Sequence, residues 1–171
     1  MVAQMILKRI LIDGAVLTAI VSPVLVLGLY INPRIFLSDY PQDVQAAVPA
    51  RTRTEVHQGI LLSIPLFLAT VAVPLYSTWL LKQENGGAIT YWMALVTIFG
   101  VHLVFFLFDL LVLDILIFCT WTPRFLVIPG TEGMPGYKDW RMHVRAHMTT
   151  GLLVLVVAAA LLALVPALLY R

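Results

Sequence analysis

The sequence carries little charge for its length. Of its 171 residues only 12% are charged, whereas 61% are hydrophobic, and the formal net charge is +2. A water-soluble domain usually has about a quarter charged residues. This deficit indicates an integral membrane protein, whose first partner is the lipid bilayer. Because the few basic residues lie at the ends of the apolar segments, a nucleic-acid partner has no support.

Cysteine and the common nucleotide-binding motifs are also scarce or missing. The single Cys119 excludes an intrachain disulfide and a zinc site built from cysteines. There is no P-loop and no dinucleotide-binding fingerprint. Cys119 is interpreted as an apolar filler, because nothing in the sequence marks it as an exposed thiolate. The sequence therefore nominates no enzymatic reaction, and whether the protein is an enzyme stays open.

Four apolar segments are long enough to cross a bilayer, which takes about 20 residues of helix. They cover residues 10–31, 57–81, 88–118 and 147–170. The first is interpreted as a retained helix, since its apolar stretch exceeds the roughly 7–15 residues of a signal peptide and no small-residue cleavage site closes it. The sequence predicts an all-α fold, a four-helix transmembrane bundle forming a single domain over residues 1–171.

The connections predict how the helices are arranged. Residues 83–87 form a short polar turn, which makes the second and third helices an antiparallel hairpin. The connections over residues 32–56 and 120–146 are long and lie on the opposite side. That side holds seven basic residues and the side of the termini holds four, among them Lys8, Arg9 and Arg171. The positive-inside rule then puts both termini outside a cell membrane, although Lys8 and Arg9 favour the reverse.

The third segment contains three ionisable residues, His102, Asp109 and Asp114. Such side chains are costly in hydrocarbon, so they usually face protein, a partner or water. The segment would extend about 46 Å, beyond a hydrocarbon core of about 30 Å. Asp109 and Asp114 therefore lie near the long connections, and only His102 is deep. In an α-helix Asp114 is about 140° around from Asp109, so the two need not face the same neighbour.

Histidines at the starts of the second and fourth segments are expected on the same side. His143 and His147 are four residues apart and share a helix face, while Glu55 precedes His57. These groups can converge with the two aspartates at one depth. The candidate polar site comprises His102, Asp109, Asp114, His57, His143 and His147.

Two kinds of chemistry suit this candidate site. Imidazoles and carboxylates bind Zn, Mn or Fe, and they also relay protons or a small ion. The H-x-x-x-H pair lacks the glutamate of the zincin motif H-E-x-x-H, so it does not identify a metal. A haem between His57 and His147 is disfavoured, because both lie at the membrane edge and His102 has no partner at its own depth.

An alternative assigns the charges a structural role. Cations of the last long connection can neutralise the two aspartates. The protein would then be a structural or accessory subunit, whose charges pair with its own loop, with a second copy of the chain or with another membrane protein. These cations are Arg124, Lys138, Arg141 and Arg145. Arg–Asp pairs would favour this alternative, and converging carboxylates and imidazoles would favour the polar site.

The last long connection itself is expected to be ordered. It contains three prolines, three glycines and the apolar run of residues 125–128, a composition unlike that of a free linker. The sequence predicts an ordered interfacial loop that caps the bundle. A second reading is that the turn over residues 130–133, with Arg124, Lys138 and Arg141, binds an anion such as a lipid phosphate.

Overall fold

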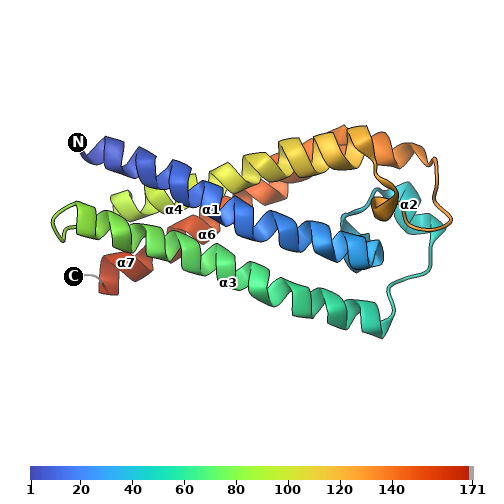
Figure 1. The fold of residues 1–171 in the computed structure, drawn as a ribbon, viewed down its shortest axis with the longest axis horizontal. Coiled ribbons are helices and arrows are strands. Elements are labelled where there is room, and N and C mark those ends of the chain that lie inside the picture. The colour runs from blue at the N-terminus through green and yellow to red at the C-terminus, as the bar shows by residue number, and fades with distance from the viewer. Residues whose placement is uncertain (170–171) are drawn as a thin grey trace.

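The computed structural model describes residues 1–169, which form helices and no strand. Four helical segments are long and apolar enough to cross a membrane: Val2–Ile31, Arg53–Glu84, Tyr91–Trp121 and Trp140–Leu169. They run side by side along the long axis of the molecule (Figure 1). The predicted all-α, four-helix transmembrane bundle is therefore confirmed. The last residue of the predicted fourth span, Tyr170, and Arg171 lie outside the described residues.

Two of the four segments are single α-helices and two change type along their length. The first is α1 (Val2–Ile31) and the second is α3 (Arg53–Glu84). In the third, α4 (Tyr91–Phe108) continues as the π-helix η2 (Asp109–Trp121). The fourth comprises α5 (Trp140–Ala146), the π-helix η5 (His147–Gly151), α6 (Leu152–Leu162) and α7 (Leu164–Leu169). All four segments extend beyond the predicted spans at one or both ends.

Polar capping residues explain where these segments begin. Thr52 and Glu55 form a capping box at the start of α3, in which each side chain binds the other residue's backbone N–H. Thr90 accepts a hydrogen bond from the backbone of Met93, so the third segment begins at Tyr91 rather than at Ala88. Asp139 caps α5 in the same way. Hydropathy alone does not reveal these starts, since the capped turns are polar.

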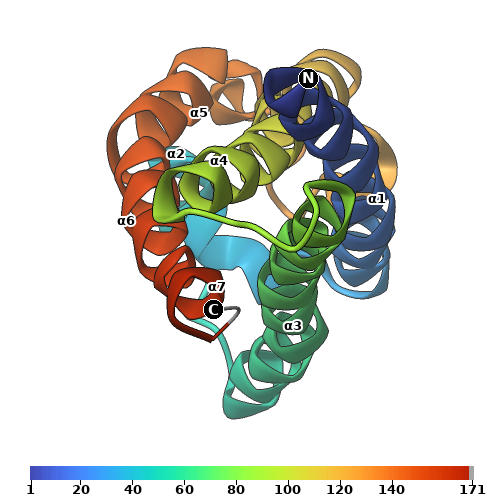
Figure 2. The ribbon, with the colours of Figure 1, turned by 90° about the vertical axis from the view of Figure 1, so that its left-hand side faces the viewer.

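Helix α4 lies at the centre of the bundle, between α1 on one side and α6 on the other (Figure 2). Glycines allow α1 and α4 to approach closely: a Cβ at Gly14 would collide with Val104, and one at Gly100 would collide with Ile10. These two contacts run in the same direction along both helices, so α1 and α4 are parallel. Small side chains likewise bring α4 and α6 together, because Ala159 is fully buried against α4.

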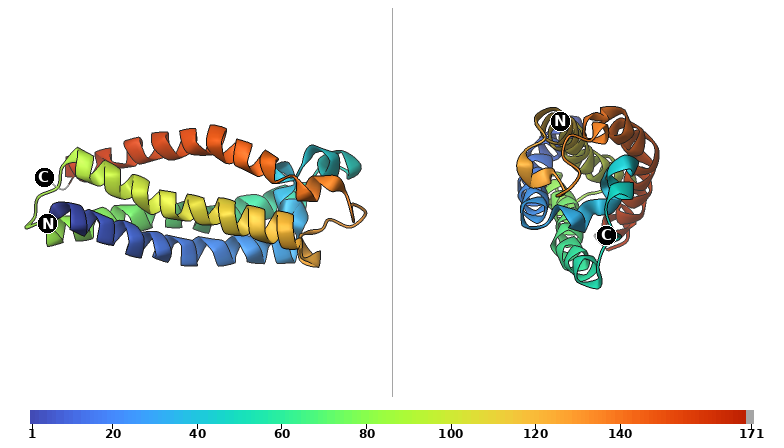
Figure 3. Two further views of the ribbon diagram at one scale, coloured as in Figure 1. Left: turned by 90° about the horizontal axis from the view of Figure 1, so that it is seen from above. Right: turned by 90° about the vertical axis from the view of Figure 1, so that its right-hand side faces the viewer.

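Both long connections fold into one ordered cap at the end opposite the N-terminus and α7 (Figures 1 and 3). The cap contains η1 (Pro33–Asp39), α2 (Gln42–Ala47), η3 (Arg124–Leu126) and η4 (Pro135–Lys138). Its apolar core is shared with the end of η2 and comprises Leu37, Tyr40, Val44, Phe118, Cys119, Leu126, Ile128 and Tyr137. The predicted ordered loop is thus present, and Cys119 is part of this buried core.

Hydrogen bonds join the two connections within the cap. The hydroxyl of Tyr40 donates to the carbonyl of Leu126 at 2.7 Å, and the carboxylate of Asp43 accepts from the backbone of Gly136 at 2.9 Å. A Cβ at position 136 would collide with the Asp43 carboxylate, so only glycine permits this contact. Segments about 90 residues apart in sequence therefore hold each other at the end of the bundle.

Candidate functional site

Two aspartates of η2 and two histidines of the fourth segment stand in a row at the cap end of the bundle. The Nε2 of His147 lies 3.3 Å from Asp109, and its Nδ1 lies 3.6 Å from the Oδ2 of Asp114. The same Asp114 oxygen lies 3.1 Å from the Nδ1 of His143. We call this row, in the order Asp109, His147, Asp114 and His143, the His–Asp ladder. It brings together four of the six predicted polar-site residues.

The π-helical geometry of η2 places both aspartates on one face. In a π-helix each residue bonds the residue five positions away, so residues five apart lie close to one above the other. The backbone N–H of Thr122 donates to Ile117 at 2.8 Å, which is this five-residue spacing. Asp109 and Asp114 therefore meet the same imidazole. The angle of about 140° expected from an α-helix is wrong here, because the helix changes type at Asp109.

The histidines are held in place by aromatic neighbours and by their own helix. The ring of His143 packs 5.0 Å from that of Phe118, and the ring of His147 packs 4.9 Å from that of Phe106. His143 is only 7% exposed. Its Nε2 is buried, and the ring lies beside the thiol of Cys119. One end of the ladder is thus an imidazole nitrogen sequestered from solvent.

Both ring nitrogens of His147 face hydrogen-bond acceptors. Besides Asp114, its Nδ1 has the carbonyl oxygen of His143 at 3.1 Å, while its Nε2 faces Asp109. Carbonyl and carboxylate oxygens only accept, whereas a neutral imidazole has a single N–H. Every contact of His147 is satisfied only when the ring carries two hydrogens or when one aspartate contributes a proton. The ladder therefore has the chemistry of a proton-binding site.

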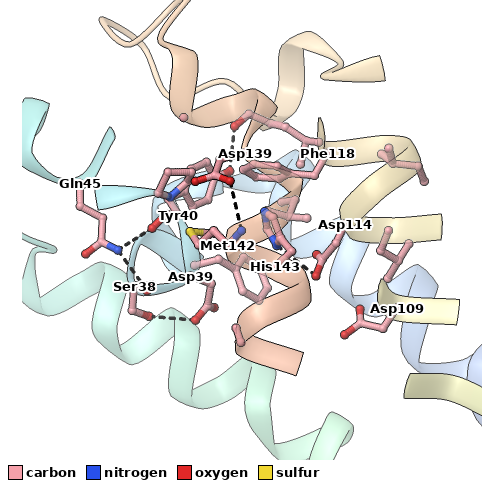
Figure 4. Close-up of a pocket in the computed structure, with 18 of the residues that line it drawn as sticks. Ser38, Asp39, Tyr40, Gln45, Asp109, Asp114, Phe118, Asp139, Met142 and His143 are labelled. Carbon is pink, nitrogen blue, oxygen red and sulfur yellow. Dashed lines mark hydrogen bonds and ion pairs between the residues drawn. The ribbon is translucent and has the colours of Figure 1, made fainter. Parts of the chain in front are cut away.

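The ladder borders a cleft of about 1400 Å³ between the bundle and the cap. Figure 4 shows Asp39, at the end of η1, across the cleft from Asp109 and Asp114 of η2. Burial raises the pKa of the Asp39 carboxyl, and the charges of Asp114 and Asp109 raise it further, while Arg51 opposes them. Three carboxylates from two separate elements thus share one electrostatic environment.

His57 and Glu55 do not reach this site. His57 is exposed, and its Nδ1 lies 2.7 Å from the carbonyl of Arg53 in its own helix. Glu55 is engaged in the capping box of α3 and in an ion pair with Arg34 at 2.6 Å. The expected convergence of these two residues with the aspartates is wrong. Sequence reasoning overlooked the capping-box pattern of Thr52 and Glu55, which gives Glu55 a local role.

His102 is also separate from the ladder and connects two helices instead. Its Nε2 lies 3.0 Å from the carbonyl oxygen of Thr70 in α3. That carbonyl precedes Pro74 by four residues, and because proline has no N–H, the usual helical donor is missing. His102 therefore supplies the hydrogen bond that the proline removes. This contact accounts for an imidazole deep in the bundle.

The cations of the loop do not neutralise the aspartates. Within residues 1–169, Asp109 and Asp114 form ion pairs with histidines alone. Lys138 donates to the Thr120 carbonyl and the Thr122 hydroxyl, and Arg141 stacks over Trp140. No contact in the described part of the chain brings Arg124 or Arg145 to either aspartate. The expected Arg–Asp pairs of the structural alternative are absent from residues 1–169.

The turn over residues 130–133 has a partner within the loop. The backbone N–H of Gly130 donates to both carboxylate oxygens of Glu132, at 2.9 and 3.1 Å. A carboxylate of the loop itself thus occupies the position that an anion was expected to take. With Lys138 engaged elsewhere, the predicted anion site at this turn has no support.

A second buried polar cluster lies toward the other end of the bundle and escaped the sequence reasoning. Asp13 of α1 is 7% exposed, accepts a hydrogen bond from Ser77 at 2.7 Å and lies 3.6 Å from Arg9. Arg9 also pairs with Glu84 at 3.0 Å, as does Lys8 at 3.1 Å. The available signal was the four-residue spacing of Arg9 and Asp13 at the entrance of the first span.

The chain was compared with known proteins. No family model, curated protein or solved structure matches it. Within residues 1–169 no group of three or more His, Cys, Asp and Glu residues is arranged to hold a metal ion.

Proposed function

We propose that this membrane protein takes up and relays protons at the capped end of its helix bundle, through the His–Asp ladder. One observation carries the proposal: four titratable groups stand in single file, with separations of 3.3, 3.6 and 3.1 Å between successive partners. Such separations allow a proton to pass between neighbours after small movements of the side chains. The mechanism requires only groups that the chain itself supplies.

The cleft gives the ladder a route to water. Asp109, Asp114, His143 and His147 all line it, so protons can enter from the cap side. A proton that reaches Asp109 can move to His147, which releases its other hydrogen toward Asp114. His143, beyond Asp114, is the most deeply buried member. Acids and imidazoles alternate along the row, so its net charge changes little while a proton is transferred. This lowers the free-energy cost of the transfer in a partly apolar site.

The orientation of this site in the membrane is part of the proposal. With the long connections in the cytoplasm, as the excess of basic residues there favours, the ladder exchanges protons with the cytoplasm. His102 lies seven residues from Asp109 along the third segment, two helical turns deeper, and the Asp13 cluster lies toward the opposite face. A proton that crosses the whole bundle would pass these groups, and its transfer through His102 would require the hydrogen bond of this residue to Thr70 to break.

Proton flux into reconstituted vesicles tests the proposal. Vesicles that enclose a pH-sensitive dye are given an electrical potential, and the rate of internal pH change is compared with that of protein-free vesicles. Wild-type protein is expected to raise the rate, and His147→Gln is expected to return it toward the protein-free rate. Asp139→Asn is the matched control, since it changes an acid of the same cleft that caps α5 and lies outside the ladder. Wild-type vesicles that behave like protein-free vesicles would contradict proton relay.

A further inference from the structure

The cleft between bundle and cap has an apolar part and a charged part. Its apolar lining includes Leu25, Val26 and Leu29, which belong to the membrane-spanning helix α1, together with Phe36, Ile117 and Phe125. Its charged lining comprises five carboxylates, of which Asp39, Asp109 and Asp114 face one another, and the guanidinium groups of Arg141 and Arg145. The apolar part therefore begins within the membrane-spanning length of α1, and the charged part lies at the cap. A cleft with this division suits an amphiphile.

The three carboxylates approach the cleft from opposite walls. Asp39 belongs to η1, and Asp109 and Asp114 belong to η2, as Figure 4 shows. The only hydrogen bond to the Asp39 side chain within residues 1–169 comes from Ser38, at 3.5 Å. Arg51 and the histidines of the ladder offset part of the repulsion among these carboxylates, and a cation between the two walls of the cleft would offset the rest. The polar end of the ligand should therefore carry a positive group.

Two arginines of α5 supply the opposite charge. Arg141 and Arg145 are one turn apart and line the same cleft. Within residues 1–169 neither forms an ion pair with a carboxylate, although acidic residues surround the cleft. Guanidinium groups bind phosphate oxygens well, because their N–H groups match the spacing of those oxygens. The charged part of the cleft thus complements a zwitterion with one cationic and one phosphate group.

We propose that this cleft binds one phospholipid molecule with a primary ammonium headgroup. Its ammonium lies between Asp39 and the η2 carboxylates, its phosphate lies at Arg141 and Arg145, and an acyl chain follows Leu25 to Leu29. A primary ammonium donates hydrogen bonds to carboxylates, which the trimethylammonium of phosphatidylcholine cannot do. The site shares Asp109 and Asp114 with the ladder, whereas Asp39, Arg141 and Arg145 lie outside it, so variants of these three residues test lipid binding separately from proton relay.

Lipid retention after purification tests the site. The protein is reconstituted into vesicles of equal parts phosphatidylethanolamine, phosphatidylcholine and phosphatidylglycerol, extracted in detergent, and its retained lipids are counted by mass spectrometry. Wild type is expected to retain phosphatidylethanolamine preferentially, at about one molecule per chain. Asp39→Asn is expected to lower this preference about tenfold, the effect of losing one hydrogen bond to a charged group. Equal retention of the three lipids, or a preference for phosphatidylglycerol, would overturn the proposal.

Control variants distinguish the loss of a single ligand contact from a general loss of folding. Glu132→Gln removes a loop acid outside the cleft and should leave retention unchanged, whereas the double variant Arg141→Gln/Arg145→Gln should lose it. Val26→Trp fills the apolar part and should also abolish retention while leaving the charged lining intact. Unfolding midpoints measured in lipid-free detergent identify any variant that fails to fold. Folded Asp39→Asn and Val26→Trp proteins that keep the wild-type preference would refute the assignment.

Discussion

Asp109 and Asp114 are five residues apart and face the same histidine ring, because the helix that carries them is π-helical from Asp109 onward. In an α-helix the same two residues would point in different directions. Stretches of π-helix occur frequently at functional sites. The change of helix type is therefore the structural basis of the ladder, and the π-helical turn that begins at His147 lies directly opposite it.

The two aspartates should differ in their contribution to stability. Asp114 contacts both His143 and His147, whereas Asp109 contacts His147 alone. We expect Asp114→Ala to lower the free energy of unfolding by about 2 kcal/mol and Asp109→Ala by about 1 kcal/mol, since each buried group left without its partner costs about 1–3 kcal/mol. Denaturant unfolding in detergent measures both. Equal losses would argue against Asp114 as the shared partner.

The energy of a contact between two ladder residues can be measured separately from the stability that each single variant loses. A double-mutant cycle of Asp114→Ala with His143→Ala isolates the energy of that contact, and groups in direct contact typically show about 0.5–3 kcal/mol of coupling. The matched cycle of Asp139→Asn with His143→Ala should be additive, because Asp139 only caps α5. Additivity in both cycles would contradict a contact between Asp114 and His143.

His102 and Pro74 should act through one hydrogen bond. We expect His102→Leu to cost about 1 kcal/mol, because the Thr70 carbonyl loses its donor. In a Pro74→Ala background the residue at 74 regains its N–H and can bond that carbonyl itself, so His102→Leu should cost much less. Thermal unfolding of the four proteins in detergent gives the comparison. A cost for His102→Leu that is the same in both backgrounds would disprove this role.

Asp13 is expected to contribute more to the stability of the folded protein than its place near the start of the first segment suggests. Asp13→Leu leaves the buried hydroxyl of Ser77 without its acceptor and leaves Arg9 with Glu84 as its remaining ion-pair partner among residues 1–169, which should cost about 1–3 kcal/mol. Replacing Arg9 and Asp13 together by leucine should cost less than Asp13→Leu alone, since the nearly buried guanidinium is then gone and Glu84 keeps Lys8 as its partner. Unfolding in detergent tests this order. A double variant that is less stable than Asp13→Leu would contradict it.

The protonation of Asp39 predicts a pH effect. Its pKa is raised in the folded protein, so the folded state holds this proton more tightly than the unfolded chain does. The favourable contribution of this proton is complete below the unfolded value of about 3.9 and is lost as the pH rises through the folded pKa. Asp39→Asn should therefore stabilise the protein at neutral pH, by an amount that shrinks toward pH 4. Unfolding midpoints of both proteins across this range provide the measurement, and an advantage that grows at low pH would contradict the sign.

The sequence predicted the class of fold and the four residues of the ladder, but not how these four residues face one another. Long apolar runs identify spanning helices without knowledge of packing, and the polar residues of the third and fourth segments identified the ladder residues. The side-chain directions of Asp109 and Asp114 were missed, because a π-helix leaves no signature in the hydropathy pattern. His57 was expected at the site because its place in the second segment gives its depth in the membrane, but not the direction in which its side chain points. Asp13 was passed over because a single acid near a helix entrance resembles an ordinary interfacial charge.

The most direct test of the ladder is the titration of its two histidines by NMR in protein labelled with ¹⁵N-histidine. When the pH is varied from about 5 to about 10, the ladder predicts that His143 and His147 titrate as one coupled pair, because both contact the carboxylate of Asp114. It further predicts that Asp114→Asn alters the titration of both, while the ¹⁵N signals of the exposed His57 at any given pH are the same in the two proteins. Independent titration of His143 and His147, unaffected by Asp114→Asn, would contradict a shared proton-binding site.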